Sequence, residues 1–220
     1  MKKIQDYELI IFDCDGVLLN SNSIKSDAFK YTCLDFGEAI SNQFVDYHQR
    51  NGGISRYKKF QYFIKEILKK DFDEKLYKDL LNKYSKYVKR ELVNCEIAEK
   101  LNDLKKITKN SYWMVASGGN QNELREVFQQ KNIFDYFELG IYGSPETKEQ
   151  IFENKLSSFN KDEVIFIGDS EYDYLVSKKF DVDFIFLTKW TEFKEWKSYC
   201  IANKINYLQD LKSLIDFKTL

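Results

Sequence analysis

The chain has 220 residues, of which 34 are Lys or Arg and 35 are Asp or Glu, so its formal net charge is −1. Because there is no basic excess to attract a phosphate backbone, we expect no nucleic-acid partner. No window approaches the roughly 18 uninterrupted apolar residues of a membrane helix, so we expect no membrane partner. The four cysteines contain no CxxC pair, and the first residues, MKKIQDYEL, lack the apolar stretch of a signal peptide. From these features we expect a cytoplasmic protein.

The first predicted strand runs directly into a polar turn. The apolar segment ELIIF at residues 8–12 is followed by Asp13, Cys14, Asp15 and Gly16. A carboxylate here can act as a nucleophile and form an acyl phosphate. A second carboxyl two residues later can protonate the leaving oxygen and then activate water. The alternative is a loop whose aspartates only cap a turn.

A long segment after this turn contains helical patterns and no convincing strand. FQYFIKEILKK and KLYKDLLNKYSKYVKREL place apolar residues three and four positions apart, as amphipathic helices do. At 220 residues the chain has room for one core and a modest insertion. We therefore expect a helical unit at residues 21–95, inserted into a core built from residues 1–20 and 96–220.

From about residue 97 the pattern alternates between helices and strands, which predicts a parallel sheet with right-handed crossovers. After the last strand we expect a loop and a closing helix, YLQDLKSLIDF at 207–217. The expected strands are YWMVAS (112–117), FELGIYG (137–143), VIFIGD (164–169) and DFIFLT (183–188), and the expected helices are IAEKLNDLKKI (97–107), NQNELREVFQQK (120–131), KEQIFENKLSSF (148–159) and EYDYLVSKKF (171–180).

Acidic residues follow several of these strands. Because the carboxyl ends of parallel strands meet at one edge, Asp13, Asp15, Asp169 and Asp173 would lie in one crevice. Such a concentration of negative charge needs a cation, and oxygen ligands of this kind suit Mg²⁺. Asp169 can reach a metal at the strand end, and Asp173 can orient the metal or its water. Either could instead cap the following helix.

Two other segments can contact phosphate. Ser117 and Gly118 stand where a strand gives way to a helix, and a hydroxyl with free N–H groups there makes a phosphate cradle. Ser-Gly-Gly is also an ordinary turn. Lys148 lies just inside a predicted helix start, where a cation opposes the helix dipole. Holding a transferring phosphoryl group would explain its position, although surface lysines are abundant in this chain.

Four motifs in this order resemble those of the haloacid dehalogenase superfamily of aspartate-nucleophile phosphotransferases. DCDGVLLN resembles its first motif, VAS its second, PETK its third and IGDSEYD its fourth. The long insertion resembles the helical cap of the phosphoglycolate phosphatase and β-phosphoglucomutase group. The resemblance implies an α/β fold, with a Rossmann-like parallel-sheet core and an inserted α-helical cap domain.

The resemblance also implies roles for the acidic residues. Asp13 would be the nucleophile and Asp15 the general acid and base. Mg²⁺ would be held by Asp13, Asp169 and the backbone carbonyl of Asp15, with Asp173 supporting the metal directly or through water. Halide-releasing members lack the second aspartate of the first motif, so Asp15 argues against dehalogenation.

The implied activity is hydrolysis of small organic phosphate monoesters, such as sugar phosphates or phosphoglycolate-like acids, through an aspartyl phosphate. Ser117, Gly118 and Lys148 would bind the phosphoryl oxygens. A β-phosphoglucomutase-like phosphosugar mutase is an alternative. So are a phosphonoacetaldehyde hydrolase, which needs a cap lysine as a Schiff base, and a protein that binds without catalysis. We expect a small phosphorylated metabolite as partner and a monomer or weak homodimer.

Three cap residues are candidates for substrate binding. The segment GISR, which begins at Gly53, resembles the cap segment with which β-phosphoglucomutases hold a distal phosphate. Arg56 would then clamp an anion, because a guanidinium binds phosphate or carboxylate in a bidentate way. The alternative is that Ser55 caps a helix and Arg56 is solvated. Lys25 stands where mutases carry a histidine that helps the acid and base. For His48 we expect a helix position without a catalytic role.

Overall fold

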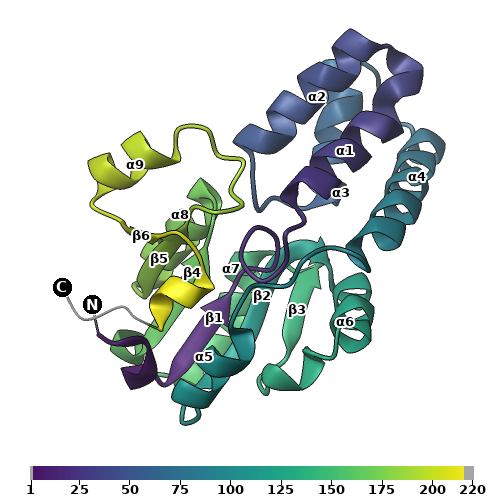
Figure 1. Cartoon of the computed structure of the whole chain (residues 1–220). Helices are drawn as coiled ribbons and strands as arrows, with labels where there is room; N and C mark the ends of the chain where they lie inside the picture. Colours follow the sequence, from purple (N-terminus) through teal and green to yellow (C-terminus); the bar gives the residue numbers. More distant parts are fainter. Residues whose placement is uncertain (1, 216–220) are drawn as a thin grey trace.

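The computed structural model describes residues 2–215 and contains a parallel sheet with helices on both faces (Figure 1). The six strands lie in the order β3-β2-β1-β4-β5-β6, and every neighbouring pair is parallel. This arrangement confirms the predicted α/β, Rossmann-like core. The strands are β1 (Leu9–Phe12), β2 (Tyr112–Asn120), β3 (Ile141–Ser144), β4 (Val164–Gly168), β5 (Asp183–Leu187) and β6 (Asn206–Leu208).

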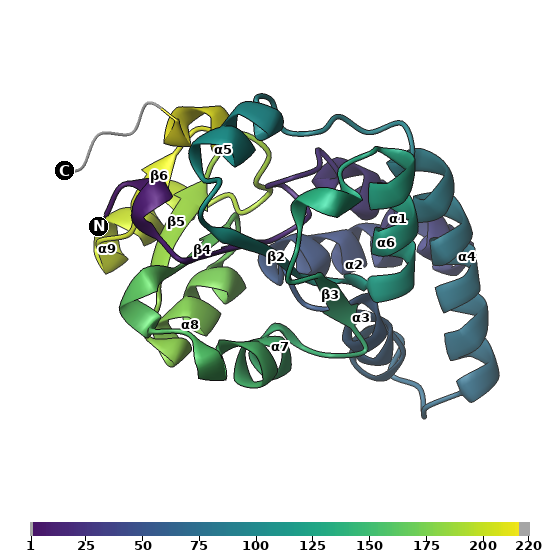
Figure 2. The same ribbon diagram turned by 90° about the horizontal axis from the view of Figure 1, so that it is seen from below.

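Helices cover the two faces of the sheet because its central strands are apolar on both sides. In β1 all four residues are buried, and alternate side chains enter different clusters. Ile10 and Phe12 pack toward α5 (Leu101–Ile107) and α6 (Gln121–Gln130). Leu9 and Ile11 pack into the opposite layer of helices. Figure 2 shows this layer on the side of the sheet away from α5 and α6. That layer comprises α7 (Lys148–Lys155), α8 (Glu171–Phe180) and α9 (Trp196–Asn203).

The C-terminal part differs from the prediction. Instead of one closing helix, the chain forms α9, then the edge strand β6 and a short 3-10 turn at Leu211–Leu214. Backbone hydrogen bonds from Thr188 to Leu208 and from Lys189 to Gln209 attach this segment beside β5. Pairing with a free sheet edge therefore overrode the helical spacing. The last residues of the predicted helix, from position 216, lie outside the described residues.

The inserted segment folds as four helices, which we call the helical unit: α1 (Asn22–Cys33), α2 (Glu38–Arg50), α3 (Arg56–Tyr62) and α4 (Glu74–Leu92). A single π-turn at Phe63–Ile67 ends the helix expected over residues 60–70. Phe29 is the centre of its packing, with ring centroids of Phe44, Phe60 and Tyr84 between 4.4 and 5.3 Å away. Among residues 2–215, no helix combines the length and apolar character needed to cross a membrane.

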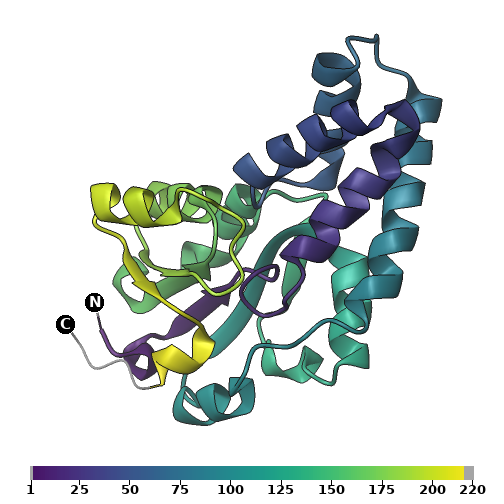
Figure 3. The same cartoon turned by 45° about the horizontal axis from the view of Figure 1, so that its top comes forward.

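The helical unit stands beyond the carboxyl ends of the strands, and two short linkers join it to the remainder, which we call the sheet unit (Figure 3). The linkers run antiparallel. Asn20 N donates to Glu96 O at 3.0 Å, and Ala98 N donates to Leu18 O at 2.9 Å. The two linkers are therefore hydrogen-bonded to each other within a few residues of Asp15.

Candidate active site

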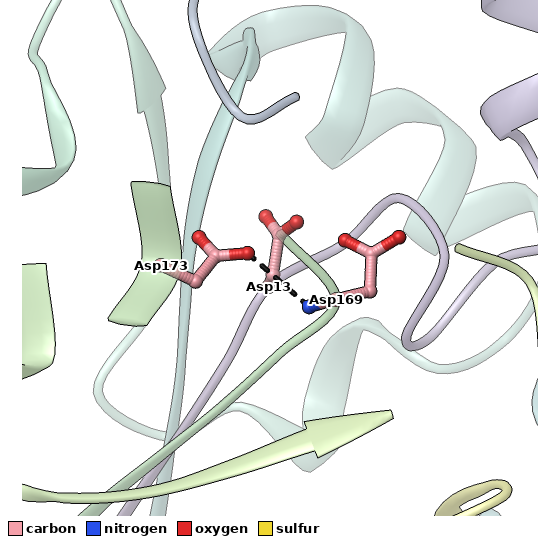
Figure 4. Close-up of side chains that lie close together, drawn as sticks. All are labelled: Asp13, Asp169 and Asp173. Atoms are coloured by element: carbon pink, nitrogen blue, oxygen red, sulfur yellow. Dashed lines mark hydrogen bonds between the residues drawn. The ribbon is translucent and has the colours of Figure 1, made fainter. Parts of the chain in front are cut away.

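The ends of the two neighbouring strands β1 and β4 bring the predicted carboxylates together. Asp13 follows β1, and its backbone N–H donates to Ile167 O of β4 at 2.8 Å. Asp169 follows β4, and Asp173 lies in the first turn of α8. Carboxylate oxygens of the three residues lie within 4.8 Å of one another, and all three side chains are buried (Figure 4). The sheet edge thus collects three of the four carboxylates that were predicted to gather there.

Lys148 lies against this cluster and is itself buried. Its Nζ is 2.8 Å from Asp13 Oδ1 and also donates a hydrogen bond to Asp173. Burial alone would lower the pKa of Lys148, but the carboxylates of Asp13 and Asp173 raise it above its usual value. The ammonium therefore stays charged beside Asp13.

Asp173 organises the turn that carries Asp169. Its Oδ2 accepts from the backbone N–H of Asp169 at 3.2 Å and from Ser170 Oγ at 2.7 Å. Ser170 and Asp173 form a capping box at the start of α8. The capping interpretation therefore holds for Asp173, and the same side chain also lies in the acidic cluster.

The Asp15 side chain points away from that cluster, toward the helical unit. It accepts hydrogen bonds from Ser21 Oγ at 2.6 Å and from Lys25 Nζ. Burial would raise the pKa of Asp15, but the Lys25 ammonium and these hydrogen bonds lower it overall. Lys25, predicted to touch substrate, therefore contacts the predicted acid and base directly.

The predicted phosphate cradle lies at the end of β2. Ser117 is fully buried, and its Oγ accepts from the backbone N–H of Gly119 at 3.0 Å. Gly118 and Gly119 line the cavity described below. A Cβ on Gly118 would lie 2.2 Å from the carbonyl oxygen of Gly53, so only glycine permits this close approach of the two units.

A cavity of about 190 Å³ lies between the helical unit and the strand ends. The sheet unit contributes Asp13, Asp15 and Asp169, and the loop that includes Gly53 approaches from the helical unit. Both charged and apolar side chains form its wall, as small-molecule sites require.

Arg56 is buried at 5 % exposure, so the solvated alternative is wrong. Its guanidinium donates to Glu123 Oε1 at 3.0 Å and to Oε2 at 2.6 Å. It also lies 4.7 Å from the centre of the Tyr84 ring. Ser55 occupies the N-cap position of α3 but makes no side-chain capping bond. Arg56 also lines the cavity, and its contact with substrate stays a prediction.

Sequence reasoning missed two residues that position Asp169. Asn22 Nδ2 donates to Asp169 Oδ2 at 2.6 Å, and Thr191 Oγ1 donates to Asp169 O at 2.6 Å. Neither belongs to a motif singled out in the sequence, so their types and spacing carried no signal. Gly16 is close as well: a Cβ there would lie 2.0 Å from Asp169 Oδ2, and its φ is 76°.

The acidic cluster fits a divalent cation. Asp13 Oδ1 is buried without a hydrogen-bond partner, although it is ion-paired with Lys148. Burial, with Asp173 and Asp15 nearby, raises the pKa of Asp13 to about 7 against the opposing effect of Lys148. Burial and the charges of Asp13 and Asp173 also raise the pKa of Asp169. Buried carboxylates that repel one another are relieved by an oxygen-seeking ion, and Mg²⁺ has this preference.

Comparison with known proteins agrees with the motifs. The haloacid dehalogenase-like hydrolase family matches residues 10–187. A predicted phosphatase from Clostridium acetobutylicum is 20% identical, with a TM-score of 0.72, over 96% of this chain and 99% of its own. A predicted phosphoglycolate phosphatase from Haemophilus somnus is 18% identical, with a TM-score of 0.67, over 84% and 87%.

The magnesium-bound YfnB of Bacillus subtilis, a haloacid dehalogenase-type hydrolase, is 15% identical, with a TM-score of 0.67, over 98% of both chains. These structures share the fold of this protein. No curated protein matches the chain. The family match spans most of the sequence and includes all four motifs. The chain therefore belongs to the haloacid dehalogenase-like hydrolase family.

Proposed function

We propose that this hydrolase is a Mg²⁺-dependent phosphatase of small organic phosphate monoesters, acting through an aspartyl phosphate on Asp13. One observation carries the proposal. The Asp13 carboxylate lies at the cavity wall between the Lys148 ammonium and Asp169, and Asp15 shares its loop. A nucleophile, a cation for the phosphoryl oxygens and an acid–base group are thus present together.

In the first step, an oxygen of Asp13 would bond to phosphorus while the ester P–O bond breaks. Lys148, together with Ser117 and Gly118, would hold the phosphoryl oxygens. The leaving oxygen needs a proton, which Asp15 would pass on from the Lys25 ammonium through the hydrogen bond between them. In the second step, ionised Asp15 would accept a proton from the water that attacks phosphorus and return it to Lys25.

Asp13, Asp169 and the backbone carbonyl of Asp15 would hold Mg²⁺, with Asp173 fixing the Asp169 turn. The bound ion would offset the repulsion between the carboxylate nucleophile and the phosphate. Asn22 and Thr191 would keep Asp169 oriented.

Residues 21–95 would form the cap domain, and residues 1–20 with 96–220 the catalytic core. Gly53 lies against Gly118, and Arg56 binds Glu123, so the two units are in contact around the cavity. Such contact would exclude bulk water during attack and must loosen for product release.

A phosphosugar mutase is the second candidate, and the contact between Lys25 and Asp15 favours retaining it. A mutase performs the same first step but returns the phosphoryl group to another hydroxyl. Isomer exchange that depends on a bisphosphate primer and releases no free phosphate would identify it.

The test is phosphate release from a panel of sugar phosphates, phosphoglycolate and an aryl phosphate, with Mg²⁺ or EDTA. We expect turnover that requires Mg²⁺ and is lost in Asp13→Asn. Turnover by a folded Asp13→Asn variant would exclude the aspartyl-phosphate mechanism.

A further inference from the structure

Lys59 differs from the other buried cations around the cavity. Lys25 pairs with Asp15, Arg56 with Glu123, and Lys148 with Asp13. Lys59 lines the same cavity at 2 % exposure, yet among residues 2–215 it forms no ion pair with a carboxylate. Within the same described range, the hydrogen bonds of its Nζ go to His48 alone, at 2.6 Å from Nδ1 and 3.3 Å from the carbonyl oxygen. A buried ammonium without a counter-ion is unfavourable unless something else supplies the negative charge.

His48 cannot supply that charge. Burial, then the nearby charges of Lys59 and Lys25, hold the pKa of His48 well below its usual value, so the ring is neutral. A neutral ring that accepts at Nδ1 carries its proton on Nε2. Burial and the positive charge of Lys25 also lower the pKa of Lys59, to about 7. The stem of Lys59 lies beside Phe29, with Nζ 5.6 Å from the ring centre.

We propose that Lys59 binds a carboxylate of the substrate, so that the preferred substrates are phosphate monoesters that also carry a carboxylate. This inference rests on the proposed phosphatase function and names its substrate class. Asp13 and Lys59 line one cavity, so a single small molecule can reach both. Arg56 was the residue first predicted to bind an anion, but both of its terminal nitrogens already donate to the Glu123 carboxylate. Arg50 also lines the cavity, but it is exposed, where water competes for an anion.

The number of donors favours a carboxylate over a second phosphate. An ammonium has three protons, and His48 accepts at two atoms, which leaves one proton of Lys59. One charge-assisted hydrogen bond suits a carboxylate oxygen. A phosphate dianion has three oxygens to satisfy, and the remaining proton of Lys59 can satisfy only one of them.

The first experiment compares 3-phosphoglycerate with glycerol 3-phosphate, which differ by a carboxylate in place of a hydroxymethyl group. For the wild type with Mg²⁺ we expect kcat/KM to favour 3-phosphoglycerate. In Lys59→Met, which keeps the length of the stem, this preference should fall roughly ten- to hundredfold, mainly through KM. Lys58→Met is the matched control, because Lys58 is the exposed neighbour on the same helix, and it should keep the wild-type preference.

The second experiment measures binding without turnover. Calorimetry on the wild-type protein with Mg²⁺ compares 3-phosphonopropionate with propylphosphonate, which lacks the carboxylate. We expect at least about tenfold tighter binding of the former, lost in Lys59→Met. Equal binding of the two by the wild type would overturn the inference, and this result needs no variant to fold. Tighter binding of propane-1,3-bisphosphonate than of 3-phosphonopropionate would also overturn it, in favour of a second phosphate.

The two experiments separate this inference from the proposed function. If no phosphate is released from any ester but the Lys59-dependent preference for 3-phosphonopropionate is present, the carboxylate site stands and the phosphatase does not. If Mg²⁺-dependent phosphate release occurs and Lys59→Met keeps the wild-type preference, only the carboxylate site is wrong. Borohydride trapping of phosphonoacetaldehyde on Lys59 would also overturn the ionic role, because the neutral amine would then act as a nucleophile.

Discussion

Arg56 and Glu123 join the helical unit to the sheet unit through two hydrogen bonds, at 3.0 and 2.6 Å. The Arg56 side chain is only 4% exposed and that of Glu123 18%, so water screens the pair weakly. Tyr57 of the same helix accepts a hydrogen bond from Asn120 at 2.8 Å. These contacts hold the first turn of α3 against the start of α6.

Removing the charge of Glu123 should destabilise the protein. In Glu123→Gln the Arg56 guanidinium stays buried without its counter-ion, so we expect the free energy of unfolding to fall by about 1–3 kcal/mol. Glu126→Gln on the same helix is the control, because its partner Lys89 is 60% exposed, and it should cost less than about 0.5 kcal/mol. Urea unfolding of both variants measures the difference. Equal losses would mean that burial of the Arg56–Glu123 pair does not increase its contribution to the free energy of unfolding.

Gly16→Ala should damage the metal site beyond its effect on the backbone. Its φ of 76° is unfavourable for alanine, and the added Cβ would lie 2.0 Å from Asp169 Oδ2. We expect the Mg²⁺ concentration for half-maximal activity to rise about tenfold or more, since Asp169 must move. Gly37→Ala is the control: its φ is 103°, but a Cβ there meets nothing within 4 Å. A normal Mg²⁺ requirement in Gly16→Ala would argue against Asp169 as a ligand.

In the metal-free protein, Asp13 should contribute a loss of stability as the pH rises from 4 to 7. The pKa of Asp13 is about 7 in the fold and 3.8 without its surroundings, so between these values the folded state binds a proton that the unfolded state has released. The free energy of unfolding then decreases with pH, by at most about 1.4 kcal/mol per pH unit. Thermal melting in EDTA measures this slope, which Mg²⁺ or Asp13→Asn should reduce. A slope of the opposite sign attributable to Asp13 would contradict the raised pKa.

Lys59 should make the free energy of unfolding rise with pH above pH 7, opposite in sign to the effect of Asp13. Its pKa is about 7 in the fold and 10.5 without its surroundings, so between these values the unfolded state binds the extra proton. The wild type should therefore gain stability relative to Lys59→Met from pH 7 to pH 9, by at most about 1.4 kcal/mol per unit. The groups that set this pKa besides burial are Lys25, Asp15, Glu192 and Lys148, all present in both proteins. A pH-independent difference between the two would mean that Lys59 is not buried as described.

Much of the site was predictable because it depends on where strands end. Asp13, Asp169 and Lys148 each occupy a fixed place in a βα unit, and a parallel sheet brings those places together. The partners of Arg56 and Lys59 could not be predicted in the same way. Lys58 and Lys59 are adjacent and identical in type, yet one is exposed and the other buried. Which of them faces the cavity depends on the angle at which α3 packs against the rest of the protein. The local sequence does not determine that angle.

The edge strand β6 was missed for a related reason. Its three residues become a strand only because β5 offers unpaired backbone groups beside them. Asn22 and Thr191 likewise can be recognised as site residues only from their hydrogen bonds to Asp169, from which they are distant in sequence. Contacts of this kind follow from the assembled fold and not from local spacing.

The antiparallel linkers determine how the helical unit can move. Because Leu18–Asn20 and Glu96–Ala98 are hydrogen-bonded to each other, both ends of the insertion are held at one place. A rigid rotation of the insertion would therefore have its axis near these linkers. Displacement grows with distance from an axis, so Asp15 and the other groups proposed for bond breaking would hardly shift. Lys59 belongs to the helical unit and would move with it, so opening would separate the carboxylate end of a substrate from the groups of the sheet unit that hold its phosphate end.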